Sequence, residues 1–160
     1  MNRYTMLNVK DTAKRQAARA LDQVAKQFAG IRRPRSGWIM SMRKALGMSA
    51  PALAKRAGVT KAAIYQAERK ELEGGVTLKH MEKLAEALGG RFVYAIVPET
   101  SIDDVLRDQA RRKAEAIVKR ASAHMALEQQ SLSSGDTQRQ IEELTEELLR
   151  DVPADFWEAP

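Results

Sequence analysis

The feature that most constrains the fold is a stretch of 20 residues, 49–68, in which one glycine separates two short segments of helical periodicity. A turn between two crossing helices needs a small residue at the crossing and a residue that tolerates positive φ in the turn, and Ala54 and Gly58 meet these needs. Apolar residues that face inward recur at helical spacing on both sides, namely Leu53, Val59, Ile64 and Ala67. The spacing therefore predicts two short helices joined by a tight turn, a helix-turn-helix.

Capping and stop signals predict further short helices around this pair. Ser49 and Thr60 each precede a helical segment with a hydroxyl that can accept a hydrogen bond from the first turn. A helix before the pair ends at Gly47, and its expected inward residues are Trp38, Ile39, Met42, Ala45 and Leu46. Another helix is expected over 77–88. These signals account for four helices in residues 36–90, whereas the helix-turn-helix domain as a whole is expected to have five.

The segments on either side of this domain have patterns of their own. Residues 11–28 carry an apolar stripe of helical period, and a basic linker follows them. The segment 91–98 is rich in β-branched and aromatic residues and ends in proline, which is typical of a strand. Because the sequence offers no second strand, the simplest hypothesis is that two copies pair antiparallel across a two-fold axis.

Two more helices are expected after the strand. A capping box opens each of them, formed by Ser101 with Asp104 and by Thr137 with Gln140. The sequence thus divides into four segments. An N-terminal helix with its basic linker (1–35) precedes the helix-turn-helix domain (36–90), and a strand (91–98) precedes an acidic helical region for dimerisation or partner binding (99–160).

Charge is distributed unevenly along the chain. Residues 1–98 hold 19 Lys and Arg against 7 Asp and Glu, a net charge of +12, whereas residues 99–160 hold 8 against 14, a net charge of −6. A basic body with an acidic end is typical of a chain with a polyanionic partner on one side and another partner, or its own basic surface, on the other. Ordinary solvated helix faces would give the same counts, so charge alone leaves the choice open.

Several classes of function are disfavoured by what the sequence lacks. With no cysteine, it has no disulfide, thiolate metal site or cysteine nucleophile, and its composition suits a reducing cytoplasm. It begins without the apolar core of a secretory signal, and its longest apolar run, 92–97, is too short to cross a membrane. His80 and His124 have no ligands at metal spacing, and no Gly-rich phosphate loop or Ser-His-Asp set is present. We expect no enzyme activity, no metal, no cofactor and no membrane partner.

The motif resembles the phage-repressor-like (Cro/C1, XRE) helix-turn-helix family over about residues 36–90, on the pattern Leu53-Ala54-x-x-x-Gly58-Val59-Thr60-x-x-x-Ile64-x-x-x-Glu68. The resemblance implies a mostly α fold and a helix, begun by Thr60, that enters the major groove. It also implies that Glu68 is an internal acidic residue, held by Arg43 or Arg56. One departure is Ala50, where the family usually has glutamine, so a phosphate-clamping side chain is missing.

The whole chain resembles one branch of that family, the small bacterial proteins called mobile mystery protein A. The resemblance rests on the N-terminal helix, on Trp38 at the start of the domain, and on the runs at 93–98, 123–129 and 141–149. Members of the branch are encoded beside a Fic-domain protein, mobile mystery protein B, which implies an antitoxin-like repressor that autoregulates a toxin–antitoxin-type operon. The motif that antitoxins use against Fic enzymes, Ser/Thr-x-x-x-Glu followed by Gly or Asn, is absent.

The candidate DNA contacts lie on and around the second motif helix. Contacts to base edges are expected from Lys61, Ala62, Tyr65 and Gln66. Contacts to phosphates are expected from Ser49, Lys55, Thr60, Arg69 and Lys70. Arg33 and Arg35 precede the domain, either as an arm on the DNA backbone or in the minor groove, or as a solvated linker. A homodimer would then require an inverted-repeat operator with half-sites about one turn apart.

The function that the sequence favours is a sequence-specific, DNA-binding transcriptional repressor, located in the cytoplasm and on the nucleoid. One alternative is an antitoxin that acts mainly by binding a protein partner through its acidic region, 99–160. Another is a nonspecific DNA-binding protein, whose sign would be steep salt dependence without sequence preference.

Overall fold

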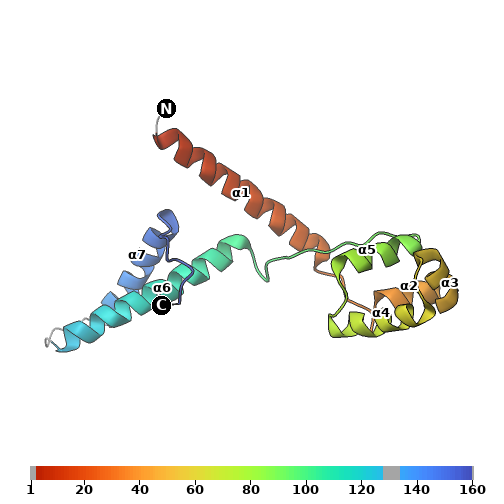
Figure 1. The fold of residues 1–160 in the computed structure, drawn as a ribbon. Coiled ribbons are helices and arrows are strands. Elements are labelled where there is room, and N and C mark those ends of the chain that lie inside the picture. The colour runs from red at the N-terminus through yellow and green to blue at the C-terminus, as the bar shows by residue number, and fades with distance from the viewer. Residues whose placement is uncertain (1–2, 128–133, 160) are drawn as a thin grey trace. The chain divides into compact units, whose positions relative to one another are not determined.

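The computed structural model describes residues 3–127 and 134–159, which hold seven helices and fall into two units (Figure 1). One unit is Ala29–Ile96. The other combines helix α1 (Arg3–Phe28) with the chain from Val97 onward. The prediction of a mostly helical fold is confirmed.

The unit Ala29–Ile96 contains four helices, which are α2 (Trp38–Ala45), α3 (Ala50–Ala57), α4 (Lys61–Glu73) and α5 (Leu78–Ala87). The predicted count of five helices for 36–90 is therefore wrong. After α5 the chain turns at Gly89, where φ is +80°, and continues extended, so no residues remain within this range for a fifth helix.

The core of this unit is made of small and branched side chains. Leu53, Ile64 and Leu84 are fully buried at its centre. The residues around them are Ile39, Ala50, Ala54, Ala57, Ala67, Ala87 and Leu88. Alanines where α3, α4 and α5 meet let the helices approach closely, so the low aromatic content costs this domain little packing.

Helix α2 presents a different face to this core than the sequence predicted. Ile39 and Arg43 are buried, whereas Trp38, Met42 and Leu46 leave 46, 41 and 50% of their surface exposed. The cause is Arg43, whose guanidinium donates to Glu68 inside the domain and so turns its own side of the helix inward. Trp38, Met42 and Leu46 therefore form an exposed apolar row, four residues apart, which we call the α2 stripe.

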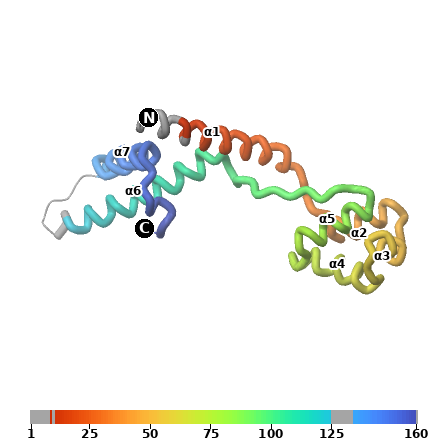
Figure 2. The backbone as a smooth tube through the Cα atoms, turned by 45° about the horizontal axis from the view of Figure 1, so that its top comes forward, coloured from red at the N-terminus to blue at the C-terminus, as the bar shows by residue number. Residues whose placement is uncertain are grey.

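Residues 91–98 do not form the predicted strand within one chain. They are extended (Figure 2) but make no backbone–backbone hydrogen bond with any part of the chain that the structure describes. A strand requires a neighbour to receive and donate its backbone hydrogen bonds, and the other described segments are helices and short turns.

In the second unit, α6 (Ile102–Leu127) and α7 (Ser134–Arg150) pack against each other, and the C-terminal tail closes over them. Ala110, Ala114 and Leu148 are buried together with Phe156, which is fully enclosed. The tail is held by polar contacts as well, because Gln109 Nε2 donates to the Phe156 carbonyl at 2.6 Å. Phe156 is thus the residue that anchors the tail.

A second polar contact joins the tail to α6. Lys113 Nζ donates to Asp155 Oδ2 at 2.8 Å, and this hydrogen bond holds the pKa of Asp155 below its ordinary value. Trp157 follows Phe156 with its ring edge-on to it, at 5.1 Å between centroids, and stays largely exposed.

Of the two predicted helix starts in the C-terminal region, one is confirmed and the other is wrong. The capping box at α6 is confirmed, since Asp104 N donates to Ser101 Oγ at 3.0 Å and Ser101 N donates to Asp104 Oδ2 at 3.2 Å. Ser101 Oγ also donates to Asp104 Oδ2 at 2.7 Å, and this hydrogen bond, together with the one from Ser101 N, lowers the pKa of Asp104. Helix α7 begins at Ser134, so Thr137 and Gln140 lie inside it and the prediction that they open it is wrong. The last two residues of the run 123–129 lie outside the described residues.

Helix α1 begins at Arg3 rather than near residue 11, and it supports the start of α6. Asp22 Oδ1 accepts a hydrogen bond from Ile102 N at 3.0 Å. The first N–H groups of a helix have no partner within the helix, so a carboxylate at this point satisfies one of them and complements the helix dipole. Asp22 thereby ties α1 to α6 in one unit.

Candidate nucleic-acid interface

The helix-turn-helix is formed by α3, a three-residue turn and α4. Gly58 ends α3 in the left-handed conformation, with φ +63° and ψ +40°. Val59 N donates to Ala54 O at 3.0 Å, which closes the turn over the crossing alanine. Thr60 then begins α4, and its Oγ1 accepts from Ala63 N at 3.1 Å. The turn therefore has the geometry that the sequence predicted, with the residues that the prediction named.

A buried ion pair fixes α4 against α2. Arg43 Nε donates to Glu68 Oε1 at 2.7 Å, and Arg43 Nη1 donates to Met48 O at 3.1 Å. The hydrogen bond to Glu68 raises the pKa of the Arg43 guanidinium, although burial acts in the opposite direction. Removing one partner of such a pair leaves a buried charge without compensation, so the pair sets how α4 is oriented in the domain.

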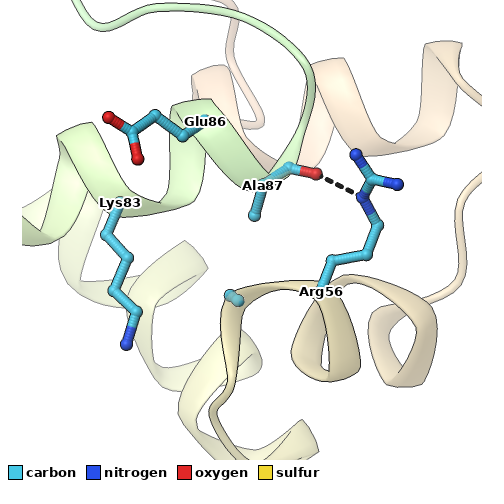
Figure 3. A pocket seen from close by; sticks show the side chains of 5 residues that line it. Arg56, Lys83, Glu86 and Ala87 are labelled. Carbon is cyan, nitrogen blue, oxygen red and sulfur yellow. Dashed lines mark hydrogen bonds between the residues drawn. The ribbon is translucent and has the colours of Figure 1, made fainter.

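Of the two arginines expected to hold Glu68, Arg43 does so and Arg56 does not. Arg56 Nε donates instead to the Ala87 carbonyl at 2.6 Å, which joins the end of α3 to the end of α5 (Figure 3). These residues, with Ala57, Lys83 and Glu86, line a hollow of about 470 Å³. Figure 3 shows Lys83 and Glu86 on α5, on the other side of that hollow from Arg56.

The outward face of α4 carries the side chains expected to contact bases. Lys61, Ala62, Tyr65 and Gln66 are all exposed. Lys61 Nζ lies 5.7 Å from the centroid of the Tyr65 ring, within the range of a cation–π contact. This contact limits the number of positions that the lysine takes, and it leaves the ammonium hydrogens able to donate to a phosphate or a base edge.

Arg69 continues the same face by one helical turn. It lines a hollow of about 520 Å³ whose other walls are Met40, Ala62, Tyr65, Glu68 and Leu72. Within the described residues, the second oxygen of Glu68, Oε2, has no hydrogen-bond partner although it is buried. Apart from Glu68, the hollow is lined by Tyr65 and apolar side chains, and Arg69 adds a positive charge to it. Positive charge suits contact with the sugar–phosphate backbone of DNA, and apolar side chains suit contact with its methyl groups.

The expected phosphate contacts lie around this face. Lys55, Arg69 and Lys70 are exposed. Ser49 and Thr60 are exposed too, and each uses its oxygen to cap a helix, Ser49 Oγ by accepting from Ala52 N at 3.2 Å. A capping hydroxyl can still donate its hydrogen to a phosphate, so capping and DNA contact are compatible. Ala50, at the position where glutamine was expected from the resemblance, is buried and offers no such group.

The basic linker is partly engaged inside the domain. Arg33 Nη1 donates to Glu71 O at 3.1 Å, at the far end of α4, while Arg35 is exposed. An arginine has five N–H donors, so this contact orders Arg33 and leaves other donors for a phosphate. The position of Arg33 is therefore set by its contact with Glu71, 38 residues away, which the sequence could not reveal.

Sequence reasoning missed the role of Glu71. Its Oε1 accepts from Trp38 N at 2.6 Å and its Oε2 accepts from Ile39 N at 3.0 Å, so a side chain of α4 caps α2. Gly37 precedes α2 with φ +80°, and a Cβ there would lie 2.7 Å from Glu71 Oε2. A local signal existed: α2 has no capping residue of its own, and Glu71 lies three residues from Glu68 on the buried face of α4.

The structure shows no sign of a metal centre in its described parts. No group of three or more His, Asp or Glu side chains there is placed to hold an ion. His124 is exposed on α6 and His80 is partly buried on α5.

This geometry defines a class of domain, a helix-turn-helix with an exposed second helix. The comparison with protein families agrees, since the helix-turn-helix family model matches residues 39–94. No curated protein and no solved structure matches the chain. A domain of this family suggests sequence-specific DNA binding and regulation of transcription. Within the described ranges, no helix is long and apolar enough to cross a membrane.

Proposed function

We propose that this protein is a transcriptional repressor that binds an inverted-repeat operator as a homodimer, in the cytoplasm and without catalysis of its own. The observation that carries the proposal is the row formed by Lys61, Tyr65 and Arg69 along the exposed face of α4. The row is mounted on a helix whose inner face is fixed by the core and by the Arg43–Glu68 ion pair. Recognition of base edges in a major groove requires a few hydrogen-bond donors that are held in fixed positions.

Charge supports a nucleic-acid partner for this unit. Most of the basic residues of the chain precede residue 99, and those on α4 lie on its exposed face. Contacts to phosphates would supply affinity, and contacts to base edges would supply sequence preference.

Two substitutions test the assignment of roles. Lys61→Ala should relax the preference at one operator position and cost about 1–3 kcal/mol on the specific site alone, because it removes a donor to a base. Arg69→Ala should weaken binding to all sequences, because it removes a phosphate contact. In a plot of the logarithm of affinity against the logarithm of salt concentration, it should reduce the magnitude of the slope by about one. Lys119→Ala, which removes an exposed charge on α6, is the control. Equal loss on specific and random DNA for Lys61→Ala would refute its role in base recognition.

A second candidate function is that of an antitoxin whose acidic region binds a protein. The observation in its favour is the exposed acidic face of α7, which carries Glu142, Glu143, Glu146 and Glu147. Among the described residues, Glu146 is the one of these four in an ion pair, with Arg107 Nη1 at 2.6 Å. The resemblance to the mobile mystery protein A branch names a Fic-domain protein as the partner. This reading and the repressor can both hold for one chain.

The antitoxin proposal is tested in the full chain by reversing charge on α7. Glu142→Lys with Glu143→Lys should abolish co-purification with the Fic-domain protein encoded beside it, if one is present, while binding to operator DNA persists. Glu82→Lys, an exposed change on α5, is the matched control and should leave co-purification intact. Retention of the partner by the double variant would rule out this face as the binding surface.

A further inference from the structure

The segment 91–98 has free backbone groups and exposed apolar side chains at once. Its backbone makes no backbone–backbone hydrogen bond to the described chain, and Val93, Tyr94 and Ile96 leave 55, 62 and 89% of their surface exposed. Extended segments with unpaired N–H and C=O groups are templates for pairing with another chain. An extended segment that also exposes apolar side chains is therefore a predicted site of association.

The side chains of the segment alternate as those of a strand do. The rings of Phe92 and Tyr94 stack at 5.8 Å between centroids with 19° between their planes, so these two residues project to the same side. Period-two alternation then puts Ile96 on that side, and Val93, Ala95 and Val97 on the other. Both sides are apolar, and the charged residues Arg91 and Glu99 stand at the two ends.

A second uncovered apolar surface borders the segment. The α2 stripe of Trp38, Met42 and Leu46 is exposed, and a Cβ on Gly90 would lie 3.7 Å from Met42 Cε. The stripe therefore reaches the point where the extended segment begins. A two-stranded ribbon alone is marginal in water and needs a packed face, which this stripe can supply.

We propose that residues 91–99 of two copies pair as an antiparallel ribbon in one register, with Ala95 opposite its own copy. The proposal rests on the homodimer of the proposed function and specifies its interface. The occupant is a second copy rather than another protein because the segment is complementary to itself in charge. Arg91 at one end of each strand lies opposite Glu99 at the other end of its partner.

The register follows from symmetry and charge. A two-fold axis perpendicular to the ribbon places one residue opposite its own copy, so the centre must be a residue and not a bond. Centring on Ala95 pairs Arg91 with Glu99, Val93 with Val97, and Tyr94 with Ile96. An aromatic residue opposite a β-branched one is among the favourable cross-strand pairs.

The two neighbouring registers are worse. Centring on Tyr94 puts Arg91 opposite Val97, and centring on Ile96 puts Glu99 opposite Val93. Each of these leaves both charges without a partner and sets one against an apolar side chain. The pairing centred on Ala95 is the one of the three in which both ends form ion pairs.

The absence of native cysteine allows a direct test by disulfide trapping in the full chain. Residues opposite each other in an antiparallel pair have Cα atoms about 4.5–5.5 Å apart, within the range of a disulfide, whereas diagonal neighbours are about 7–8 Å apart and outside it. Ala95→Cys should therefore form a cross-linked dimer under mild oxidation at least tenfold faster than Tyr94→Cys or Ile96→Cys alone.

Mixing the two slow variants provides the matched control. With a size tag on one of them, Tyr94→Cys and Ile96→Cys should give a cross-linked heterodimer at a rate close to that of Ala95→Cys, because these positions face each other across the ribbon. Faster self-cross-linking of Tyr94→Cys or of Ile96→Cys than of Ala95→Cys would overturn the register. Failure of every variant to cross-link would overturn the ribbon.

Charge exchange tests the ends of the ribbon independently. Arg91→Glu and Glu99→Arg should each weaken dimerisation about two- to tenfold in sedimentation, since a dimer contains two such exposed pairs. The double variant should restore it, and lack of restoration would overturn the pairing of these two residues.

Binding of the cross-linked Ala95→Cys dimer to its own upstream DNA separates the two proposals. Cross-linking in the expected order without sequence preference would leave the ribbon standing and refute the repressor. Sequence preference with no cross-linking at Ala95 would refute the ribbon and leave the repressor standing.

Discussion

The capping of α2 by Glu71 gives the sharpest prediction about stability. Its two carboxylate oxygens accept from Trp38 N and Ile39 N at 2.6 and 3.0 Å, and the carboxylate is almost fully buried. Glu71→Gln keeps the shape but turns one acceptor into an amide NH₂, which faces an N–H group that also donates. One of the two hydrogen bonds is then lost and the other becomes a neutral one.

The size of the effect follows from these contacts. Loss of a hydrogen bond to a charged group costs about 1.5–3 kcal/mol, and removal of a negative charge from a helix N-terminus costs about 0.3–1 kcal/mol. We expect Glu71→Gln to lower the free energy of unfolding of the helix-turn-helix unit by about 2–4 kcal/mol. That is a large share of the stability of a small domain.

The two tryptophans make the assay specific. Trp38 lies in the helix-turn-helix unit and Trp157 in the other, so urea unfolding followed by fluorescence in a Trp157→Phe background reports on α2 alone. Glu73→Gln, an exposed change on the same helix, is the matched control and should cost less than about 0.5 kcal/mol. If Glu71→Gln unfolds within 0.5 kcal/mol of this control, the capping argument is refuted.

Two further predictions use the same assay. Gly37→Ala should destabilise the unit more than Gly58→Ala, because both have positive φ but a Cβ at position 37 would also meet the Glu71 carboxylate at 2.7 Å; equal effects would contradict this. In the other unit, Asp155→Asn should loosen the tail at pH 7, as followed by Trp157 fluorescence in a Trp38→Phe background. The pKa of Asp155 is lowered by Lys113, so its contribution to stability is fully present above about pH 4, the ordinary value, and is lost as the pH falls through the lowered pKa. A difference between variant and native chain that persisted unchanged below that range would count against the contact.

The turn of the helix-turn-helix was predictable because its constraints are local. Gly58 supplies positive φ, and Ser49 and Thr60 cap the helices through hydrogen bonds that span three residues. Such short-range requirements leave a direct trace in residue type and spacing. The outward face of α4 follows from them, since the buried face fixes which side is exposed.

The features that sequence reasoning missed depend on partners far away in the chain. Arg43 turned the face of α2 by pairing with Glu68, 25 residues on, and Glu71 capped that helix from a distance of more than 30 residues. Apolar periodicity alone could not predict that a charged residue would occupy the inner face. The segment 91–98 is not a strand within one chain for a related reason, because pairing requires a second extended segment and the described part of a single chain supplies none.

Whether the chain recognises a particular DNA sequence is measured by a binding titration at two salt concentrations. The full-length protein is titrated against its own upstream DNA and against a shuffled sequence of equal length. We expect a preference of about a thousandfold or more for the upstream DNA at physiological salt, with the affinity for both sequences falling as salt rises. Equal affinity for the two sequences would contradict it and leave a nonspecific DNA binder or a protein-binding antitoxin.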